Sequence, residues 1–251
     1  MGHRTTPLVA VVGARGGAGA SCVAAAVAHG LRRAHGRGVL VDLDAGGPGV
    51  EVLLGVEDEP GARWPELTGA RGDVDGRGLL AALPRWGAVP VLSTTRLLPA
   101  APDDDVVLDV CAALLRSGET VVADLPRPGA WTPAVRALLA DADEVVVVTT
   151  ASMPGAAGAV AVARALDGLT GGARARLVLR GPGAGRVEAT DVERLTGLPV
   201  VAQVGEDRAL AGAVERGEGP RVGRGTRLGR AGARVAELLA AGPTALVGSP
   251  R

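Results

Sequence analysis

The side chains of this chain best suited to chemistry are one serine and three aspartates. Ser21 follows a glycine-rich loop. Asp42 and Asp44 end one apolar run, and Asp124 ends another. If these apolar runs are neighbouring parallel strands, their carboxyl ends meet at one edge of a sheet and the four side chains gather there. A hydroxyl and carboxylates in that arrangement are typical of a Mg²⁺ site beside a nucleotide, with a second carboxylate to orient water. The alternative is that these acids cap loops or helices.

The loop before Ser21 predicts a phosphate cradle. The run Leu8–Val12 leads into glycines at positions 13, 16, 17 and 19, followed by an alanine-rich helical segment. Exposed backbone N–H groups and the positive end of a helix dipole both favour an anion at such a junction. Compared with the pattern G-x-x-x-x-G-K-S/T, the loop has Ala14 in place of the first glycine and Ala20 in place of the lysine. The residues expected to hold the phosphates are Gly16, Gly17, Ala18, Gly19, Ala20, Ser21 and Cys22.

Composition limits how the missing lysine can be replaced. The chain has 251 residues and contains no lysine, so all 27 basic residues are arginine and any basic contact to phosphate must come from Arg. The simplest explanation of this composition is a GC-rich genome. A formal net charge of zero argues against broad non-specific binding of nucleic acid, and aromatic residues make up only 1% of the chain, which leaves few platforms for base stacking. Two cysteines, Cys22 and Cys111, fit a reducing cytosol.

Short apolar runs alternate with helical patterns, which predicts a doubly wound α/β fold with a mainly parallel sheet of about seven strands and helices on both faces. The expected strands are Leu8–Gly13, Gly38–Leu43, Val89–Ser93, Thr120–Asp124, Glu144–Thr149, Arg176–Leu179 and Pro199–Gln203. The expected helices are Ser21–His35, Arg77–Leu83, Asp105–Arg116, Pro133–Ala140, Gly155–Leu169, Asp191–Leu195, Arg208–Arg216 and Thr226–Ala241.

A single domain over residues 1–251 is expected. Residues 55–78 are polar and rich in glycine and proline, and we interpret them as a surface excursion because the strand pattern resumes directly afterwards; a linker between domains is the alternative. Residues 242–251 are expected to be a loose tail.

Three motifs in chain order resemble those of the ParA/MinD class of deviant Walker A ATPases. They are K/R-G-G-x-G-x-S/T at Arg15–Ser21, hVDxD at Leu40–Asp44 and hhhDxP at Val121–Pro126. The sequence is most similar to the actinobacterial CpaE-like group, which includes septum-site-determining proteins and proteins of pilus or secretion loci related to TadZ. The segment Leu54–Leu67, with its Arg-Trp-Pro stretch, carries that closer resemblance.

The resemblance implies roles for individual residues. Ser21 and Asp124 would hold the Mg²⁺ of a bound ATP, and Asp44 would serve hydrolysis. Asp42 is expected to be a ligand of the same Mg²⁺. Proteins of this class dimerise over ATP and reach the partner's phosphates with a signature basic residue, which here is Arg15. The alternative for Arg15 is a solvated loop side chain.

Two positions depart from the class. Loss of the lysine at Ala20 removes charge near the β- and γ-phosphates, and we expect this to slow hydrolysis far more than it weakens binding. Arg180 stands where the class often has an asparagine at the adenine end; a guanidinium can stack on a base but cannot copy the paired donor and acceptor of an amide.

The resemblance also implies partners and a location. We expect a cytoplasmic homodimer with nucleotide between its subunits, acting with proteins of a division, pilus or secretion machinery. The weak apolar face of the last helix favours packing of that helix on the domain. Peripheral membrane contact through this helix is the alternative. The first hypothesis for the function is an ATP-dependent positional or assembly factor with weak or no hydrolysis. The second is a scaffold that no longer binds nucleotide, and a metabolic P-loop enzyme is the least supported.

Overall fold

The computed structural model describes residues 6–44, 49–97, 101–170, 174–181, 187–205 and 207–241. The strands are β1 (Leu8–Gly13), β2 (Val39–Asp42), β3 (Arg85–Trp86), β4 (Val89–Leu92), β5 (Val121–Leu125), β6 (Glu144–Thr150), β7 (Arg174–Arg180) and β8 (Val200–Val204). The α-helices are α1 (Ala20–His35), α2 (Val50–Leu54), α3 (Gly76–Ala82), α4 (Asp104–Arg116), α5 (Pro133–Asp141), α6 (Met153–Leu166), α7 (Ala189–Thr196), α8 (Arg208–Glu215) and α9 (Arg227–Ala240).

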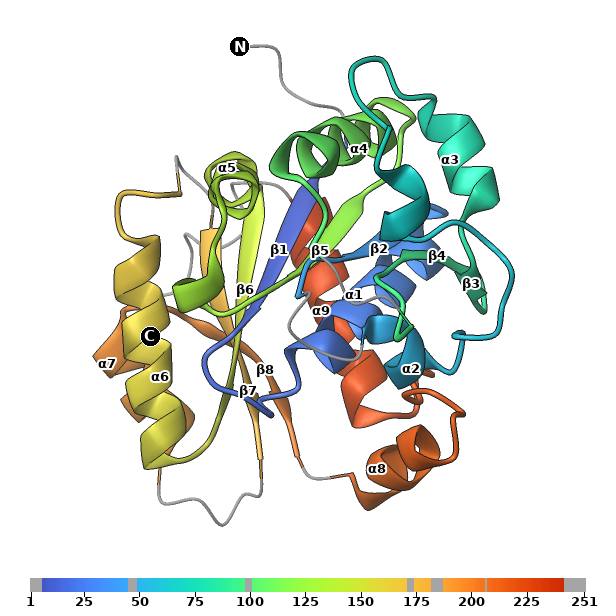
Figure 1. Cartoon of the computed structure of the whole chain (residues 1–251). Coiled ribbons are helices and arrows are strands. Elements are labelled where there is room, and N and C mark those ends of the chain that lie inside the picture. The colour runs from blue at the N-terminus through green and yellow to red at the C-terminus, as the bar shows by residue number, and fades with distance from the viewer. Residues whose placement is uncertain are drawn as a thin grey trace.

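The strands form one sheet in the order β3-β4-β2-β5-β1-β6-β7-β8, with β1 in its interior (Figure 1). All the neighbouring pairs are parallel except β3 and β4. The predicted α/β class and mainly parallel sheet are therefore confirmed, but the described sheet has eight strands rather than about seven. The additional strand is β3, a two-residue antiparallel partner of β4 that the turn at Gly87, with a φ of 58°, makes possible. A pairing this short leaves no periodic pattern in the sequence.

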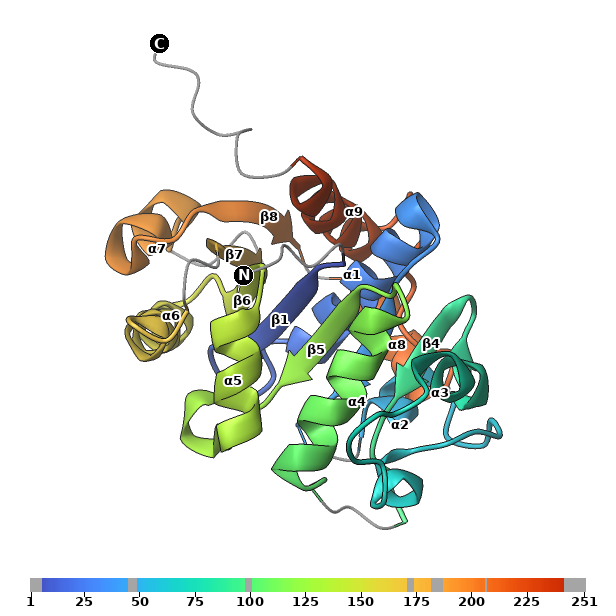
Figure 2. The same ribbon diagram turned by 90° about the horizontal axis from the view of Figure 1, so that it is seen from above.

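Both faces of the sheet are covered, which explains why β1 is apolar throughout. Leu8, Ala10 and Val12 pack in one cluster with residues of α3, α4, α5, α6 and α7. Val9 and Val11 face the opposite way and pack with α1, α2, α8 and α9. Viewed from above, α4 and α5 lie on one side of the central strands and α1 and α9 on the other (Figure 2). A parallel strand that is buried on both faces does not alternate between polar and apolar residues.

The last helix packs directly on the helix that follows the glycine loop. A Cβ added at Gly232 of α9 would lie 2.1 Å from the Ala26 carbonyl oxygen of α1, and one at Gly30 of α1 would lie 2.9 Å from the Gly232 carbonyl oxygen. The two backbones approach this closely because neither glycine has a side chain. Leu228 and Val235 of α9 are buried and belong to the same apolar cluster as residues of α1. Across the described segments, no helix combines the length and apolar character needed to cross a bilayer.

The predicted excursion at residues 55–78 leaves the sheet after α2 and returns to it. It contains a 3-10 helix, Trp64–Leu67, and ends in the first turn of α3. Both β2, before the excursion, and β4, after it, pair side by side in the sheet. The short helix α2 was not predicted, since five residues give no helical period. The predicted tail at 242–251 lies outside the described residues.

Candidate functional site

The loop between β1 and α1 has the backbone of a phosphate cradle. Gly17 and Gly19 have positive φ angles of 72° and 83°, which residues with side chains rarely adopt. The loop is fixed at its start, where the Ala14 amide donates to the Val148 carbonyl of β6 at 2.9 Å. Gly19 is the N-cap of α1 and has no side chain to cap the helix. The first amides of α1, which have no carbonyl partner within the helix, therefore remain available to an anion.

An open pocket of about 330 Å³ adjoins this loop. Its polar lining includes the serine and the three aspartates singled out from the sequence, and its other lining residues include Gly16, Gly17, Ala18, Gly19, Ala20 and Cys22. The strand order accounts for this, because β5 lies between β1 and β2 and pairs in parallel with both. Asp42 and Asp124 are direct neighbours across β2 and β5. The structure thus brings the predicted side chains together at the carboxyl edge of the sheet.

The carboxylates at this edge are crowded and largely buried. Asp124 is 2% exposed and Asp42 is 3% exposed, whereas Asp44 is exposed. Burial and then the nearby charge of Asp42 raise the pKa of Asp124 well above its usual range, against a hydrogen bond from Ser21 that lowers it. Burial likewise raises the pKa of Asp42 to about 6. A cation beside these groups would offset both effects, so the oxygen donors fit Mg²⁺ on chemical grounds.

The described residues contain no group of three or more His, Cys, Asp or Glu side chains arranged to hold a metal ion by themselves. Mg²⁺ usually keeps several waters and is bound by one or two carboxylates together with substrate phosphates. Ser21 and Asp124, already joined by a hydrogen bond, therefore suit an ion that arrives with a nucleotide. In such a site Mg²⁺ would neutralise phosphate charge.

Asp42 also has a structural role that the sequence did not reveal. Its Oδ2 accepts the Val50 amide at 2.8 Å and the Ser93 hydroxyl at 2.9 Å, and its Oδ1 accepts the Asp44 amide at 3.1 Å. The indole Nε1 of Trp64 donates to the Asp42 backbone carbonyl at 2.7 Å. These bonds use three of the roughly four acceptor positions of the carboxylate, so Oδ1 keeps one position for a metal ion while Asp42 also holds the start of α2.

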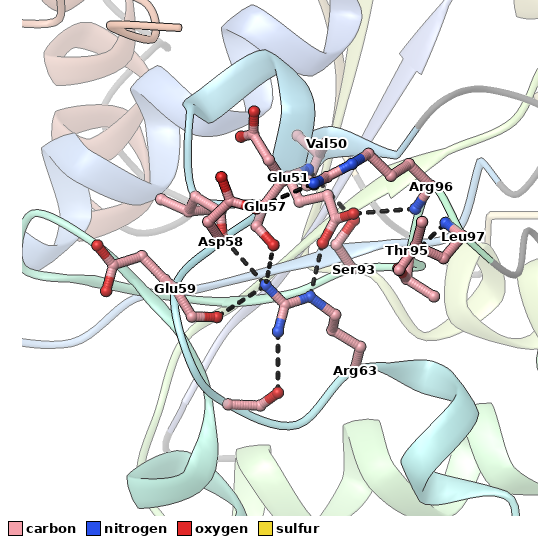
Figure 3. A network of polar contacts seen from close by, with 12 residues as sticks. Val50, Glu51, Glu57, Asp58, Glu59, Arg63, Ser93, Thr95, Arg96 and Leu97 are labelled. Atoms are coloured by element: carbon pink, nitrogen blue, oxygen red, sulfur yellow. Dashed lines mark hydrogen bonds and ion pairs between the residues drawn. The ribbon is translucent and has the colours of Figure 1, made fainter.

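Arg63, in the Arg-Trp-Pro stretch, ties the excursion to α2 (Figure 3). Its Nε donates to Glu51 Oε2 at 2.6 Å, and the other guanidinium nitrogens donate to the carbonyl oxygens of residues 56, 57, 59 and 61. Glu51 Oε1 accepts the Arg96 amide at 2.9 Å. Arg63 thereby fixes the loop that carries Trp64 against the strand-end acids.

Three arginines lie near the loop, in different settings. Arg15 and Arg127 are exposed and line the pocket. Arg127 was not predicted as a pocket residue, although its position two residues after the end of β5 could have indicated it. Arg180, which the resemblance places at the adenine end of a nucleotide, donates through its Nη1 to the Ala18 carbonyl oxygen of the glycine loop at 3.1 Å. Arg180 also lines a second pocket of about 530 Å³, beside β7 and β8.

The arrangement supports anion binding better than rapid phosphoryl transfer. The loop supplies backbone donors and a helix N-terminus, but Ala20 supplies no charge. Asp44, at the rim of the pocket, is an exposed carboxylate that can orient a water molecule. Cys22 is unsuited to nucleophilic chemistry because burial raises the pKa of its thiol, and the neutral thiol is a weak nucleophile.

Comparison with solved structures places this fold in a defined class. The chain superposes on a ParA family ATPase from Chlorobium tepidum TLS with a TM-score of 0.75 and 17% identity, covering 94% of this chain and 100% of that one. Aquifex aeolicus MinD, in a MinC:MinD cell division complex, gives a TM-score of 0.75 and 16% identity over 97% and 99% of the chains. Pyrococcus horikoshii OT3 MinD, complexed with Mg-ADP, gives 0.72 and 20% over 97% and 100%. The chain has the P-loop fold of the ParA and MinD ATPases.

Sequence comparison adds two relatives from Mycobacterium tuberculosis, the uncharacterized proteins MT3760 of strain CDC 1551 / Oshkosh and Rv3660c of strain ATCC 25618 / H37Rv. Each is 39% identical over 235 residues, which is 92% of this chain but 63% of the relative. The chain therefore spans less than two thirds of the length of these relatives. No protein-family model matches the chain.

Proposed function

We propose that this protein is an ATP-binding regulator of the ParA/MinD kind that hydrolyses ATP slowly or not at all. The observation that carries the proposal is that the glycine loop, Ser21, Asp44 and Asp124 line one and the same pocket. Ser21 and Asp124 would hold Mg²⁺, and the loop amides would hold the phosphates. The absence of a lysine at Ala20 separates binding, which backbone donors support, from hydrolysis, which needs added charge.

We further propose that ATP acts as a positional or assembly signal, through a homodimer that encloses the nucleotide. Arg15 is an exposed residue of the loop and lines the pocket, which suits a side chain that reaches a partner subunit. The likeness in fold to MinD, one example of which is solved with MinC, supports a protein partner of a division, pilus or secretion machinery.

The decisive experiment is thermal unfolding of the purified protein with and without ATP and Mg²⁺. Ligand at a hundred times its dissociation constant stabilises a protein by about 2.7 kcal/mol. Ser21→Ala and Asp124→Asn should abolish the part of the shift that requires Mg²⁺. Ser117→Ala, at the end of α4, is the matched control and should leave the shift intact. No shift of the wild-type protein at millimolar ATP would favour a scaffold that does not bind nucleotide.

A gain-of-function variant tests the proposed separation of binding from hydrolysis. Ala20→Lys places an ammonium at the position of the missing charge, where we expect tighter ATP binding and a faster release of phosphate. Equal rates for wild type and Ala20→Lys, with both binding ATP, would show that the missing lysine does not limit turnover. Dimerisation with ATP, measured by light scattering, should be lost in Arg15→Ala if that residue crosses to the partner.

A further inference from the structure

A basic side chain from a distant strand lies on the glycine loop. Arg180 is the last residue of β7, which is separated from β1 by β6 in the sheet. Its Nη1 donates to the Ala18 carbonyl oxygen at 3.1 Å, across 162 positions of sequence. The contact lies at the start of α1, just before Ala20.

The guanidinium fills the space beside Gly19. A Cβ added there would lie 1.5 Å from Arg180 Nη1 and 2.6 Å from Cζ. Any side chain at this position would have to displace the guanidinium. Glycine at position 19 is thus needed both for its φ of 83° and for the place of Arg180.

The contact leaves donor capacity unused. The Arg180 Nε is buried and has no hydrogen-bond partner among the described residues. A buried N–H without an acceptor is costly, so an anion that brings one is favoured.

We propose that Arg180 supplies, from β7, the positive charge for the polyphosphate of a bound nucleotide that Ala20 does not provide. This inference rests on the proposed function, since it assigns a role at the same nucleotide site. Guanidinium suits the task because it is always charged and binds phosphate through paired N–H groups. Among the arginines near the loop, Arg15 and Arg127 are exposed, whereas Arg180 is already held against the loop backbone.

The test is calorimetric titration with ATP, with inorganic tripolyphosphate and with adenosine, each in the presence of Mg²⁺. Arg180→Gln removes the charge, and we expect ATP and tripolyphosphate to bind about 10- to 100-fold more weakly. Arg180→Lys keeps the charge but not the paired donors, so it should bind both ligands more tightly than Arg180→Gln and more weakly than the wild type. The matched control is Arg174→Gln, which makes the same charge change at the opposite end of β7. A second variant, Ala20→Lys combined with Arg180→Gln, should recover the affinity, because it restores a charge at the loop.

The outcomes separate the two proposals. If the wild-type protein binds neither ATP nor tripolyphosphate, the proposed function fails and the inference with it. If the wild type binds ATP and Arg180→Gln binds tripolyphosphate at least as tightly as the wild type does, the inference alone is wrong. Tighter binding by Arg180→Gln would mean that Arg180 obstructs the phosphate site. Weaker binding of ATP and adenosine with unchanged binding of tripolyphosphate would also overturn it, in favour of stacking on the base. Circular dichroism of each variant checks that the fold is intact.

Discussion

Replacing Arg63 by methionine should lower the free energy of unfolding far more than the loss of any one surface charge does. The guanidinium pairs with Glu51, which is 1% exposed, and donates to four backbone carbonyl groups of the excursion. Methionine preserves much of the apolar stem but leaves the Glu51 carboxylate buried without its partner. Breaking a buried ion pair on one side costs about 3–5 kcal/mol. For a chain of this size that corresponds to a fall in Tm of roughly 6–20 °C.

The assay is urea unfolding followed by far-ultraviolet circular dichroism and by tryptophan fluorescence. Arg71→Met is the control, because the Arg71–Asp103 ion pair is 47% and 71% exposed and such pairs contribute at most about 1 kcal/mol. The double variant Glu51→Gln with Arg63→Met should recover part of the loss, since no isolated charge then remains buried. A loss for Arg63→Met that matches the control would refute the argument that this pair holds the excursion in place.

Three other perturbations test separate parts of the fold. Gly232→Ala would bring a Cβ to 2.1 Å from a carbonyl oxygen of α1 and should destabilise the folded protein by about 1–3 kcal/mol. In contrast, the new Cβ of Gly212→Ala in α8 would meet only the end of a flexible arginine side chain, and this variant should stabilise the folded protein by up to about 1 kcal/mol. Urea midpoints that move in the same direction would contradict this contrast. Trp64→Phe removes the donor to the buried Asp42 carbonyl and should cost about 1–3 kcal/mol; a smaller loss would mean that water or another group replaces the indole. Burial raises the pKa of Glu144 from 4.5 to about 7, so the folded state binds the proton more tightly and stability should fall as pH rises through that interval, by on the order of 3 kcal/mol. Asp42 and Asp124, whose pKa values are also raised, contribute to the same slope. Glu144→Gln should therefore reduce the slope, and equal slopes for the wild type and this variant would exclude the raised pKa of Glu144.

The sequence predicted most of the sheet because parallel strands buried on both faces are rich in apolar residues. β1 is apolar throughout, and β5 and β6 contain the apolar runs Val121–Ala123 and Val145–Val148. It also predicted which acids meet, since strand-end positions of a parallel sheet share one edge. The contact of Arg180 with the glycine loop was not predicted, because side-chain reach across two strands depends on rotamers that no local pattern encodes. The link between Trp64 and Asp42 was missed for the same reason.

The two hydrogen-bonded indoles are intrinsic fluorescent probes of the pocket. The chain has three tryptophans and neither tyrosine nor phenylalanine, so its near-ultraviolet spectrum comes almost entirely from indole. Trp64 donates to the carbonyl of Asp42, and Trp131 donates to the carbonyl of Pro126, two residues beyond Asp124. Two of the three chromophores are therefore attached to the chain segments that carry the acidic edge of the pocket. A ligand or ion that shifts this edge should therefore change their emission, which would allow its binding to be followed without a label.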